Sequence, residues 1–478
     1  MIEKGALKVA IVGGGITGLA TAHYLEQAAA AEGWGITGVV LERDSRMGGK
    51  LLTTTLDGFL VEGGPDSIFT QKPWALRLLD ELGMGDEVIQ QQANGVFLLH
   101  GGKLHRVPRG LVGPVPTKPQ DLLGASFLTW RGKLRAGLEP FVPRRRDGDE
   151  ESLGGFLRRR LGTNVAQNLV ETFTAGVYAG DPMDLGTRQL FPTLVDWEDR
   201  YGSLAKGIRA ARARAAGGAP PRPFVSLRRG MSSLPLAIAG GLRRLKLLPG
   251  KQVTTIARGR RNDRPLYELT VDGGEPILAD CVALTIPAPG AASVLRTILP
   301  KAADLLDQMS FASTCSVSLA FRREAVGNPL DGSGFLVPRT EPSPVTGCTW
   351  SSAKWPGRAG EGWVLLRAFV GWAGDGSFMQ RDDPDLVHSV TEALRPLLEL
   401  RGEPERTWVQ RWPDAMPQYK VGHGPWVEAV DRAMSAEPGL FLAGASYRGI
   451  GVPDCVRQGQ ETAQRMASLV SQPAEARA

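Results

Sequence analysis

The sequence predicts a mixed α/β (α+β) fold with a Rossmann-like dinucleotide-binding domain, an antiparallel-sheet domain and a helical domain. An apolar run over residues 8–12 ends in glycines and leads into a helical pattern over 16–30, as in a βαβ unit. Residues 310–372 alternate in polarity and are rich in Val, Phe, Trp and Ser, which favours antiparallel strands. Residues 75–175 have a mostly helical pattern. These three observations support the expected fold class.

The domain boundaries follow from where these patterns change along the 478-residue chain. We expect a discontinuous dinucleotide-binding domain over residues 1–75, 206–300 and 411–478, because the last buried strand and the closing helix lie near the C-terminus. Residues 76–205 are predicted to form the helical domain, and residues 301–410 the domain that binds the substrate.

Composition and charge are those of a globular protein without membrane-spanning segments. Hydrophobic residues make up 42% of the chain and charged residues 22%, which is typical of soluble domains. No apolar stretch approaches the roughly 20 residues that cross a bilayer, and the N-terminus lacks a signal-peptide pattern. The net charge of +6 allows a solvated surface, or attraction to an acidic substrate or an anionic membrane. We expect no nucleic-acid partner.

The cysteines and histidines form no recognisable metal site. The four cysteines contain no CxxC pair, and the five histidines show no ligand spacing. Unpaired thiols are typical of a reducing compartment, so we expect a cytoplasmic protein. A peripheral contact with the inner face of the membrane and a homodimer are both compatible with the sequence.

The strongest motif is the glycine pattern Gly13-x-Gly15-x-x-Gly18, directly after the first strand. Gly13 would form the tight turn, Gly15 would let the backbone approach a pyrophosphate, and Gly18 would let the helix pack on the sheet. Ile16 and Thr17 open the helix, whose free N–H groups and positive end attract phosphates. The pattern therefore predicts a dinucleotide site.

A carboxylate and two further glycine turns accompany this motif. Glu42 ends the second strand, where its carboxylate can accept hydrogen bonds from both ribose hydroxyls. Residues 46–50 then supply two glycines and a lysine, which would bring the backbone close to the second half of the cofactor. Residues 62–67 form another tight turn of the same kind. A nicotinamide dehydrogenase has no special role for residues 46–50, so we favour a flavin dinucleotide.

Residues 42–50 resemble the extended FAD fingerprint of the amine oxidase superfamily, and residues 442–455 resemble its second flavin motif. Within that superfamily, residues 176–181 and 416–419 look like the protoporphyrinogen/coproporphyrinogen oxidase family. The resemblance covers essentially the whole chain. It implies an FAD-binding domain of the amine oxidase/p-hydroxybenzoate hydroxylase type and a non-covalently bound FAD, with Cys455 as the residue to watch for a covalent tether.

The resemblance also implies which residues form the site. Trp412 would pack near the isoalloxazine, Val253 would contact the adenine through its backbone, and Val452 would begin a helix that favours negative charge on the reduced flavin. By position, the residues that would contact FAD are Gly13, Gly15, Ile16, Thr17, Gly18, Glu42, Arg43, Gly48, Gly49, Lys50, Gly64, Pro65, Asp66, Ser67, Val253, Trp412, Gly444, Gly451, Val452 and Pro453. Those that would contact the substrate are Gly176, Gly334, Phe335, Leu336 and Phe369, with plain core packing as the alternative for the apolar ones.

The implied reaction is the six-electron oxidation of a porphyrinogen to the porphyrin in heme biosynthesis. Such an oxidoreductase acts on CH–CH groups, with dioxygen as acceptor and hydrogen peroxide as product. The substrate would be coproporphyrinogen III, protoporphyrinogen IX or both. Flavin N5 would accept hydride, so we assign no catalytic side chain and no metal. His423 is the one histidine placed to carry a proton, with a structural role as the alternative.

Two departures from the family bear on the propionate contacts. Eukaryotic members carry an arginine just ahead of the segment that matches 97–105, where this chain has Asn94-Gly95-Val96. They carry another before the Gly-Val-Tyr-Ala-Gly element, where this chain has Ala175. The first difference favours coproporphyrinogen III. Four basic residues remain as candidate propionate partners by charge alone, namely Lys72, Lys103, Arg106 and Lys354.

Two other functions stay open on the sequence. One is another flavoenzyme of the superfamily, such as an amine oxidase or a phytoene desaturase. The other is a non-catalytic binding protein similar to the Rab escort and GDI proteins, against which the retained Glu42 and Gly48-Gly49 argue. Residues 120–146 likewise allow two interpretations, an interfacial membrane helix or an amphipathic helix that covers the active-site domain.

Overall fold

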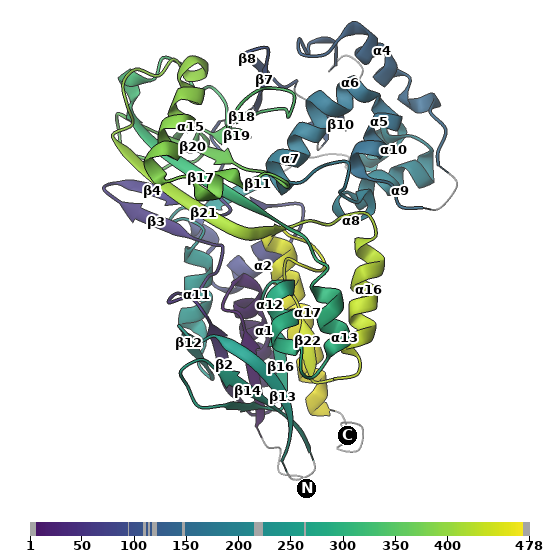
Figure 1. Ribbon diagram of the computed structural model, residues 1–478, viewed down its shortest axis with the longest axis vertical. Helices are drawn as coiled ribbons and strands as arrows, with labels where there is room; N and C mark the ends of the chain where they lie inside the picture. Colours follow the sequence, from purple (N-terminus) through teal and green to yellow (C-terminus); the bar gives the residue numbers. More distant parts are fainter. Residues whose placement is uncertain are drawn as a thin grey trace.

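Figure 1 shows an elongated molecule built from two main sheets and a group of helices. The computed structural model describes residues 6–471, apart from residues 94, 109–110, 113–114, 117–121, 146–148, 215–222 and 262–263. A parallel sheet with its helices forms one end of the molecule. A seven-stranded sheet and the helical group lie next to each other at the other end (Figure 1).

A five-stranded parallel sheet forms the core of the dinucleotide-binding domain. Its strand order is β12-β2-β1-β16-β22, with β1 (Leu7–Val12) at the centre. The other strands are β2 (Ile36–Glu42), β12 (Leu245–Pro249), β16 (Cys281–Leu284) and β22 (Leu440–Leu442). The apolar run expected at residues 8–12, the second strand expected to end at Glu42 and the last buried strand expected near the C-terminus are thus confirmed as strands of one sheet.

Both faces of this sheet are covered, because successive side chains of β1 enter different cores. Val9 and Ile11 pack against one group of helices, whereas Ala10 and Val12 pack against another. The first group is α1 (Ile16–Glu32), α2 (Trp74–Glu81), α11 (Ser233–Gly241) and α17 (Val452–Ser471). The second is α12 (Ala288–Leu295), α13 (Pro300–Leu306) and α16 (His423–Met434), with the antiparallel strands β13 (Val253–Arg261), β14 (Arg264–Val271) and β15 (Ile277–Ala279).

The second sheet has the order β21-β17-β20-β19-β18-β7-β8 and is antiparallel except for the β18–β7 pair. Its strands are β17 (Phe311–Arg322), β20 (Trp363–Val370), β21 (Arg406–Pro417), β18 (Gly334–Leu336), β19 (Gly347–Thr349), β7 (Phe97–His100) and β8 (Lys103–Arg106). Helix α15 (Asp383–Leu398) packs on one face, and its apolar side chains share a core with that face. The other face is left for the site.

The helical group lies in residues 122–214, around one apolar core. Its main helices are α4 (Trp130–Gly137), α5 (Leu153–Leu161), α7 (Thr172–Tyr178), α9 (Pro192–Tyr201) and α10 (Leu204–Arg214). Arg160 is fully buried there, and Glu139 lies 2.8 Å from its guanidinium, so the buried charge is paired.

The expectation of a mostly helical stretch over residues 75–175 is confirmed at α2 and again from α4 onwards, but it is wrong for residues 88–106, which contain three strands. β7 and β8 form a hairpin that joins the second sheet. Gly101 and Gly102 connect them with φ of +57° and +74°, the backbone that a tight hairpin turn requires. Among the described residues, no helix is long and apolar enough to span a bilayer.

Candidate flavin and substrate site

The predicted phosphate loop has the backbone that its three glycines imply. Gly13 adopts a φ of +110°. A Cβ on Gly18 would lie 1.9 Å from the Gly13 carbonyl oxygen, so only glycine lets α1 pack this closely. A Cβ on Gly15 would meet nothing within 4 Å. Gly15 is also the N-cap of α1 and provides no side-chain cap, so open space lies before helix N–H groups that can bind phosphate oxygens.

Glu42 is held in place at the end of β2. Its Oε2 accepts a hydrogen bond from the Gly14 N–H at 2.7 Å, and its Oε1 accepts one from the Asp44 N–H at 3.0 Å. Each oxygen keeps a second lone pair for a ribose hydroxyl. The Lys251 N–H donates to the Glu42 carbonyl at 2.7 Å, which brings the start of β13, and with it Val253, to the same strand end.

The Gly48-Gly49 loop packs directly on the phosphate loop. Gly48 forms a parallel bridge with Gly15, and its N–H donates to the Gly14 carbonyl at 2.8 Å. A Cβ on Gly49 would lie 3.1 Å from the Gly15 Cα, so the two loops approach as closely as backbones allow. Lys50 follows and donates to the Ala415 carbonyl; burial lowers the pKa of its ammonium group. The side chain of the predicted contact Arg43 is 75% exposed.

The turn at Gly64-Pro65-Asp66-Ser67 lies between the two sheets. A Cβ on Gly64 would lie 1.7 Å from the Lys50 carbonyl oxygen, so this turn packs against the previous loop. The Trp412 Nε1–H donates to the Gly63 carbonyl at 2.7 Å, which brings the predicted flavin neighbour Trp412 to the turn. Together with the contacts between Gly48 and Gly15, these contacts connect four predicted cofactor segments, namely the phosphate loop, the Gly48–Lys50 loop, this turn and Trp412.

Asp66 is charged in this setting. Burial by itself would raise its pKa, but the charge and hydrogen bond of Lys354, the charge of Arg367 and the hydrogen bond of Trp355 outweigh burial, and the pKa lies well below the usual range. Its Oδ2 accepts from Lys354 Nζ at 2.8 Å and from Trp355 Nε1 at 3.1 Å.

The second flavin motif starts α17 beside the phosphate loop, and α17 packs along α1. Gly444 and Gly449 adopt φ of +125° and +117°. The Tyr419 hydroxyl joins their two segments, because it donates to the Ala445 carbonyl at 2.8 Å and accepts from the Gly449 N–H at 2.9 Å. Val452 is the first residue of α17, as the sequence implies, so Gly451, Val452 and Pro453 lie at its N-terminus.

Cys455 and His423 are both buried, and burial keeps each side chain uncharged at neutral pH. Burial raises the pKa of the Cys455 thiol to about 11, so the thiol stays protonated and unreactive at neutral pH. His423 stacks on Tyr419 with ring centroids 3.7 Å apart, and its Nε2 bonds to the Tyr447 carbonyl at 2.8 Å. Burial lowers the pKa of His423 to about 4, so the ring is neutral and already has a partner. The structural interpretation of His423 therefore fits better than a proton carrier.

Of the predicted substrate residues, Gly334, Leu336 and Phe369 lie on one face of the second sheet, Phe335 lies on its other face, and Gly176 lies on α7. Leu336, Gly347, Phe369, Ser316 and Gln410 are cross-strand neighbours in a single row over β18, β19, β20, β17 and β21. Leu336 points at Gly176, since a Cβ there would lie 2.7 Å from Leu336 Cδ2. Phe335 points to the opposite face and lies in the core under α15 with 2% exposure.

A buried arginine on the same face was missed by the sequence reasoning. Arg367 is 6% exposed, and its two terminal nitrogens donate to the Gly64 and Gly63 carbonyls at 2.7 and 3.1 Å. Its guanidinium also lies 4.9 Å from the centre of the Phe369 ring. The available signal was a charged residue inside the apolar run of residues 363–370, because a buried charge needs a partner or a task.

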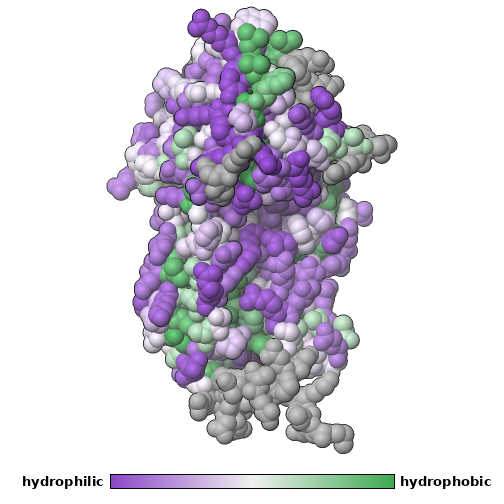
Figure 2. Space-filling model, turned by 90° about the vertical axis from the view of Figure 1, so that its right-hand side faces the viewer, coloured by the Kyte–Doolittle hydropathy of each residue, from purple (hydrophilic) through white to green (hydrophobic). Residues whose placement is uncertain are grey.

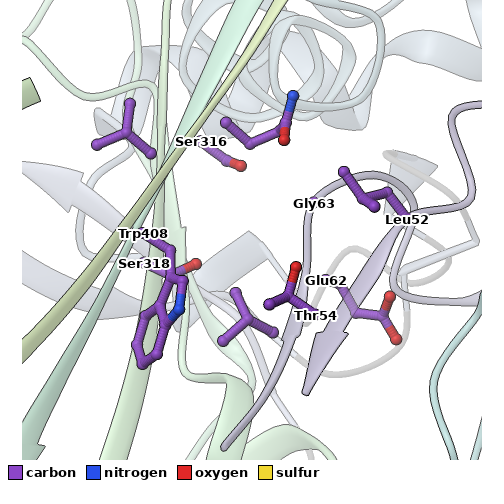
Figure 3. Close-up of a pocket in the computed structure, with 10 residues that line it drawn as sticks. Leu52, Thr54, Glu62, Gly63, Ser316, Ser318 and Trp408 are labelled. Carbon is purple, nitrogen blue, oxygen red and sulfur yellow. The ribbon is translucent and has the colours of Figure 1, made fainter. Parts of the chain in front are cut away.

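A cavity of about 120 Å³ lies beside Gly63, between the hairpin of β3 (Thr53–Leu56) and β4 (Phe59–Glu62) and the second sheet. Figure 3 shows Ser316, Ser318 and Trp408 on one side and Leu52, Thr54 and Glu62 on the other. The small side chains of Ser316 and Ser318 on β17 leave this space. It is polar enough to hold water.

The candidate propionate partners mostly have other partners. Lys72 binds Asp454 at 2.7 Å, Lys354 binds Asp66, and Arg106 binds Asp331 at 2.8 Å. Lys103 lies exposed on β8. Asn94, at the position of the missing family arginine, lies outside the described residues.

Comparison with known proteins covers almost the whole chain. The family described as flavin containing amine oxidoreductase matches residues 16–467. A coproporphyrinogen III oxidase from Bacillus subtilis (strain 168) is 35% identical, over 96% of this chain and 97% of its own. A chloroplastic protoporphyrinogen oxidase from Oryza sativa subsp. japonica is 32% identical, over 96% and 88%.

A solved structure agrees with these relatives. The crystal structure of a protein from Exiguobacterium sp. 255-15, assigned provisionally as a protoporphyrinogen oxidase, superimposes with a TM-score of 0.85 at 32% identity. The superposition covers 97% of this chain and 99% of that one. The expected fold type and the expected FAD cofactor are thereby confirmed.

Proposed function

The chain belongs to the flavin containing amine oxidoreductase family, and we propose that it oxidises a porphyrinogen to the porphyrin with FAD and dioxygen. The observation that carries the proposal is the juxtaposition of a complete dinucleotide cradle with the sheet face that carries Leu336 and Phe369 opposite Gly176. The full-length similarity to porphyrinogen oxidases at 30% identity or more supports the same substrate class.

The residues of this chain would bind and orient, rather than donate reactive groups. Bound FAD supplies hydride acceptance and reoxidation by dioxygen. The glycine loops and Glu42 would hold the cofactor, and the apolar side chains of Leu336 and Phe369 would pack against the macrocycle. The balanced reaction takes one porphyrinogen and three dioxygen to one porphyrin and three hydrogen peroxide. A reaction that needs no acid or base from the protein is consistent with His423, which is neutral and already hydrogen-bonded to the Tyr447 carbonyl.

Coproporphyrinogen III is the substrate that we favour. It carries four propionates and protoporphyrinogen IX two, and an unpaired buried carboxylate is very costly. Because Lys72, Lys354 and Arg106 already bind carboxylates of this chain, the propionates would remain at the solvated rim of the site. Relative kcat/KM values for the two porphyrinogens test this choice. A more than tenfold preference for protoporphyrinogen IX, about 1.4 kcal/mol in transition-state binding, would contradict it.

A substrate panel tests the proposal against the two rivals. The purified protein should be yellow and should convert porphyrinogen, whereas a primary amine and a polyene should leave its flavin oxidised. A colourless folded protein that takes up no added FAD would favour a GDI-like binding protein. Reduction of the flavin by the amine but not by porphyrinogen would favour an amine oxidase.

We also propose that the protein resides in the cytoplasm and makes a peripheral membrane contact at α4. Trp130, Leu134, Leu138 and Phe141 follow one face of the helix and its continuation, and Trp130 and Phe141 are 68% and 82% exposed. Figure 2 shows apolar surface at the end of the molecule where α4 lies, next to hydrophilic surface. Leu123 is also exposed, whereas Leu122, Phe127 and Leu128 of the same segment are buried in the helical group and support the covering role instead.

Flotation with vesicles containing phosphatidylglycerol tests the contact. Wild type and the control Leu236→Ala, which removes an exposed leucine from α11, should float with the vesicles. The double variant Trp130→Ala/Phe141→Ala should float much less, because it removes the two most exposed aromatic anchors. Equal flotation of the double variant, or no flotation of wild type, would contradict the proposal.

A further inference from the structure

We propose that Arg367 is a positioning residue for the flavin: it sets the conformation of the turn at Gly63–Ser67 and gives the cofactor a positive electrostatic environment. The inference rests on the proposed function, because that function places this turn beside the flavin ring. It concerns a residue of the substrate-side sheet that serves the cofactor rather than the substrate.

The geometry shows how Arg367 controls the turn. Its two terminal nitrogens hold the carbonyls of two consecutive residues, Gly63 and Gly64, and Trp412 Nε1 donates to the Gly63 carbonyl as well. The C=O and N–H of a trans peptide point in opposite directions, so holding the Gly63 carbonyl directs the Gly64 N–H away from Arg367. Within the described residues this N–H donates to no protein acceptor, so it is available to a bound group.

Arginine is the side chain that this arrangement needs. Its planar fork reaches two acceptors at once, whereas a lysine ammonium is a single point of charge. The fork is fixed from both sides: Ser316 Oγ lies 3.4 Å from one nitrogen, and the Phe369 ring lies below the guanidinium. A lysine in this place would keep the charge and lose one of the two carbonyl contacts.

The charges around the turn do not cancel. Arg367, Lys354 and Arg358 are three cations, and Asp66 and Glu62 are two carboxylates, so the cluster carries one net positive charge when both acids are ionised. Burial raises the pKa of Glu62, which makes the excess larger when that acid binds a proton. A buried positive charge stabilises an electron-rich neighbour, and the reduced flavin is more electron-rich than the oxidised one.

Three variants of the holoenzyme separate charge from geometry. Arg367→Met removes both, Arg367→Lys keeps the charge, and Arg322→Met is a control that removes an arginine from the exposed end of β17. The readouts are the FAD dissociation constant of the apoprotein, the midpoint potential of bound FAD from spectroelectrochemistry, and the melting temperature. None of them depends on turnover, so they stay informative whatever the substrate is.

We expect Arg367→Met to weaken FAD binding at least roughly tenfold and to shift the midpoint potential to more negative values. Arg367→Lys should weaken binding with a potential close to wild type, and Arg322→Met should change neither. A folded Arg367→Met protein with wild-type affinity and potential would overturn the inference. If Arg367→Met does not fold, wild-type FAD affinity in Arg367→Lys would overturn it. Wild-type protein without FAD affinity would instead remove the proposed function.

Discussion

Replacing Glu42 by alanine removes a carboxylate that serves both the cofactor and the loops that bind it. The side chain is 9% exposed, and it accepts hydrogen bonds from the Gly14 and Asp44 N–H groups at 2.7 and 3.0 Å. Loss of its charge-assisted hydrogen bonds to the ribose should weaken FAD binding by about 1.5–3 kcal/mol. That free energy corresponds to roughly one to two decades in the dissociation constant.

The same substitution should lower the stability of the apoprotein by roughly 1–3 kcal/mol, because the two N–H groups lose their acceptor. FAD titration of the apoprotein, followed by quenching of flavin fluorescence, measures the affinity, and urea unfolding measures the stability. Asp304→Ala is the matched control, since Asp304 is an exposed acid paired with Arg296 far from the cradle. Wild-type FAD affinity in a folded Glu42→Ala protein would refute the assignment of Glu42 to the ribose.

Two further predictions concern groups that burial keeps neutral. Denaturation should release all of the FAD, because the pKa of the Cys455 thiol is raised to about 11; flavin retained on the chain would contradict this and Cys455→Ser would identify the tether. His423 has a pKa of about 4 in the fold against an ordinary 6.5, so the unfolded chain binds the extra proton between these values. Protonation of the unfolded chain at His423 should therefore lower the free energy of unfolding by roughly 3 kcal/mol as the pH falls from 6.5 towards 4. Urea unfolding at several pH values should show a smaller loss in His423→Gln, and equal slopes would contradict the assignment.

Local sequence patterns predicted the cofactor half of the molecule well. The motif from Gly13 to Gly18, with Glu42 at the next strand end, depends on contacts between residues close in sequence, and the structure shows the turn, the helix start and the carboxylate in the expected places. The N-terminus of α17 at Val452 was implied in the same way. In such segments a glycine stands where the backbone needs a positive φ, as at Gly13, or a close approach that excludes a Cβ, as at Gly18.

Contacts between distant segments were harder to foresee. Arg367 lies 303 residues from its partner Gly64, so no spacing rule connects them. The hairpin at Gly101-Gly102 lies in the stretch that the sequence predicts to be mostly helical, although paired glycines between short apolar runs are themselves a hairpin signal. Phe335 illustrates a third limit: alternation shows that Phe335 and Leu336 face opposite sides, but only the packing of α15 shows which side is core.

The proposed oxidation of a porphyrinogen is tested most directly by its stoichiometry. Holoenzyme, coproporphyrinogen III and air-saturated buffer should yield coproporphyrin III, followed by its fluorescence, with dioxygen consumption recorded in parallel at an oxygen electrode. The account predicts three dioxygen consumed and three hydrogen peroxide formed for each porphyrin, at a rate proportional to enzyme concentration. Porphyrin formation no faster than in the enzyme-free control, with FAD bound, would contradict it.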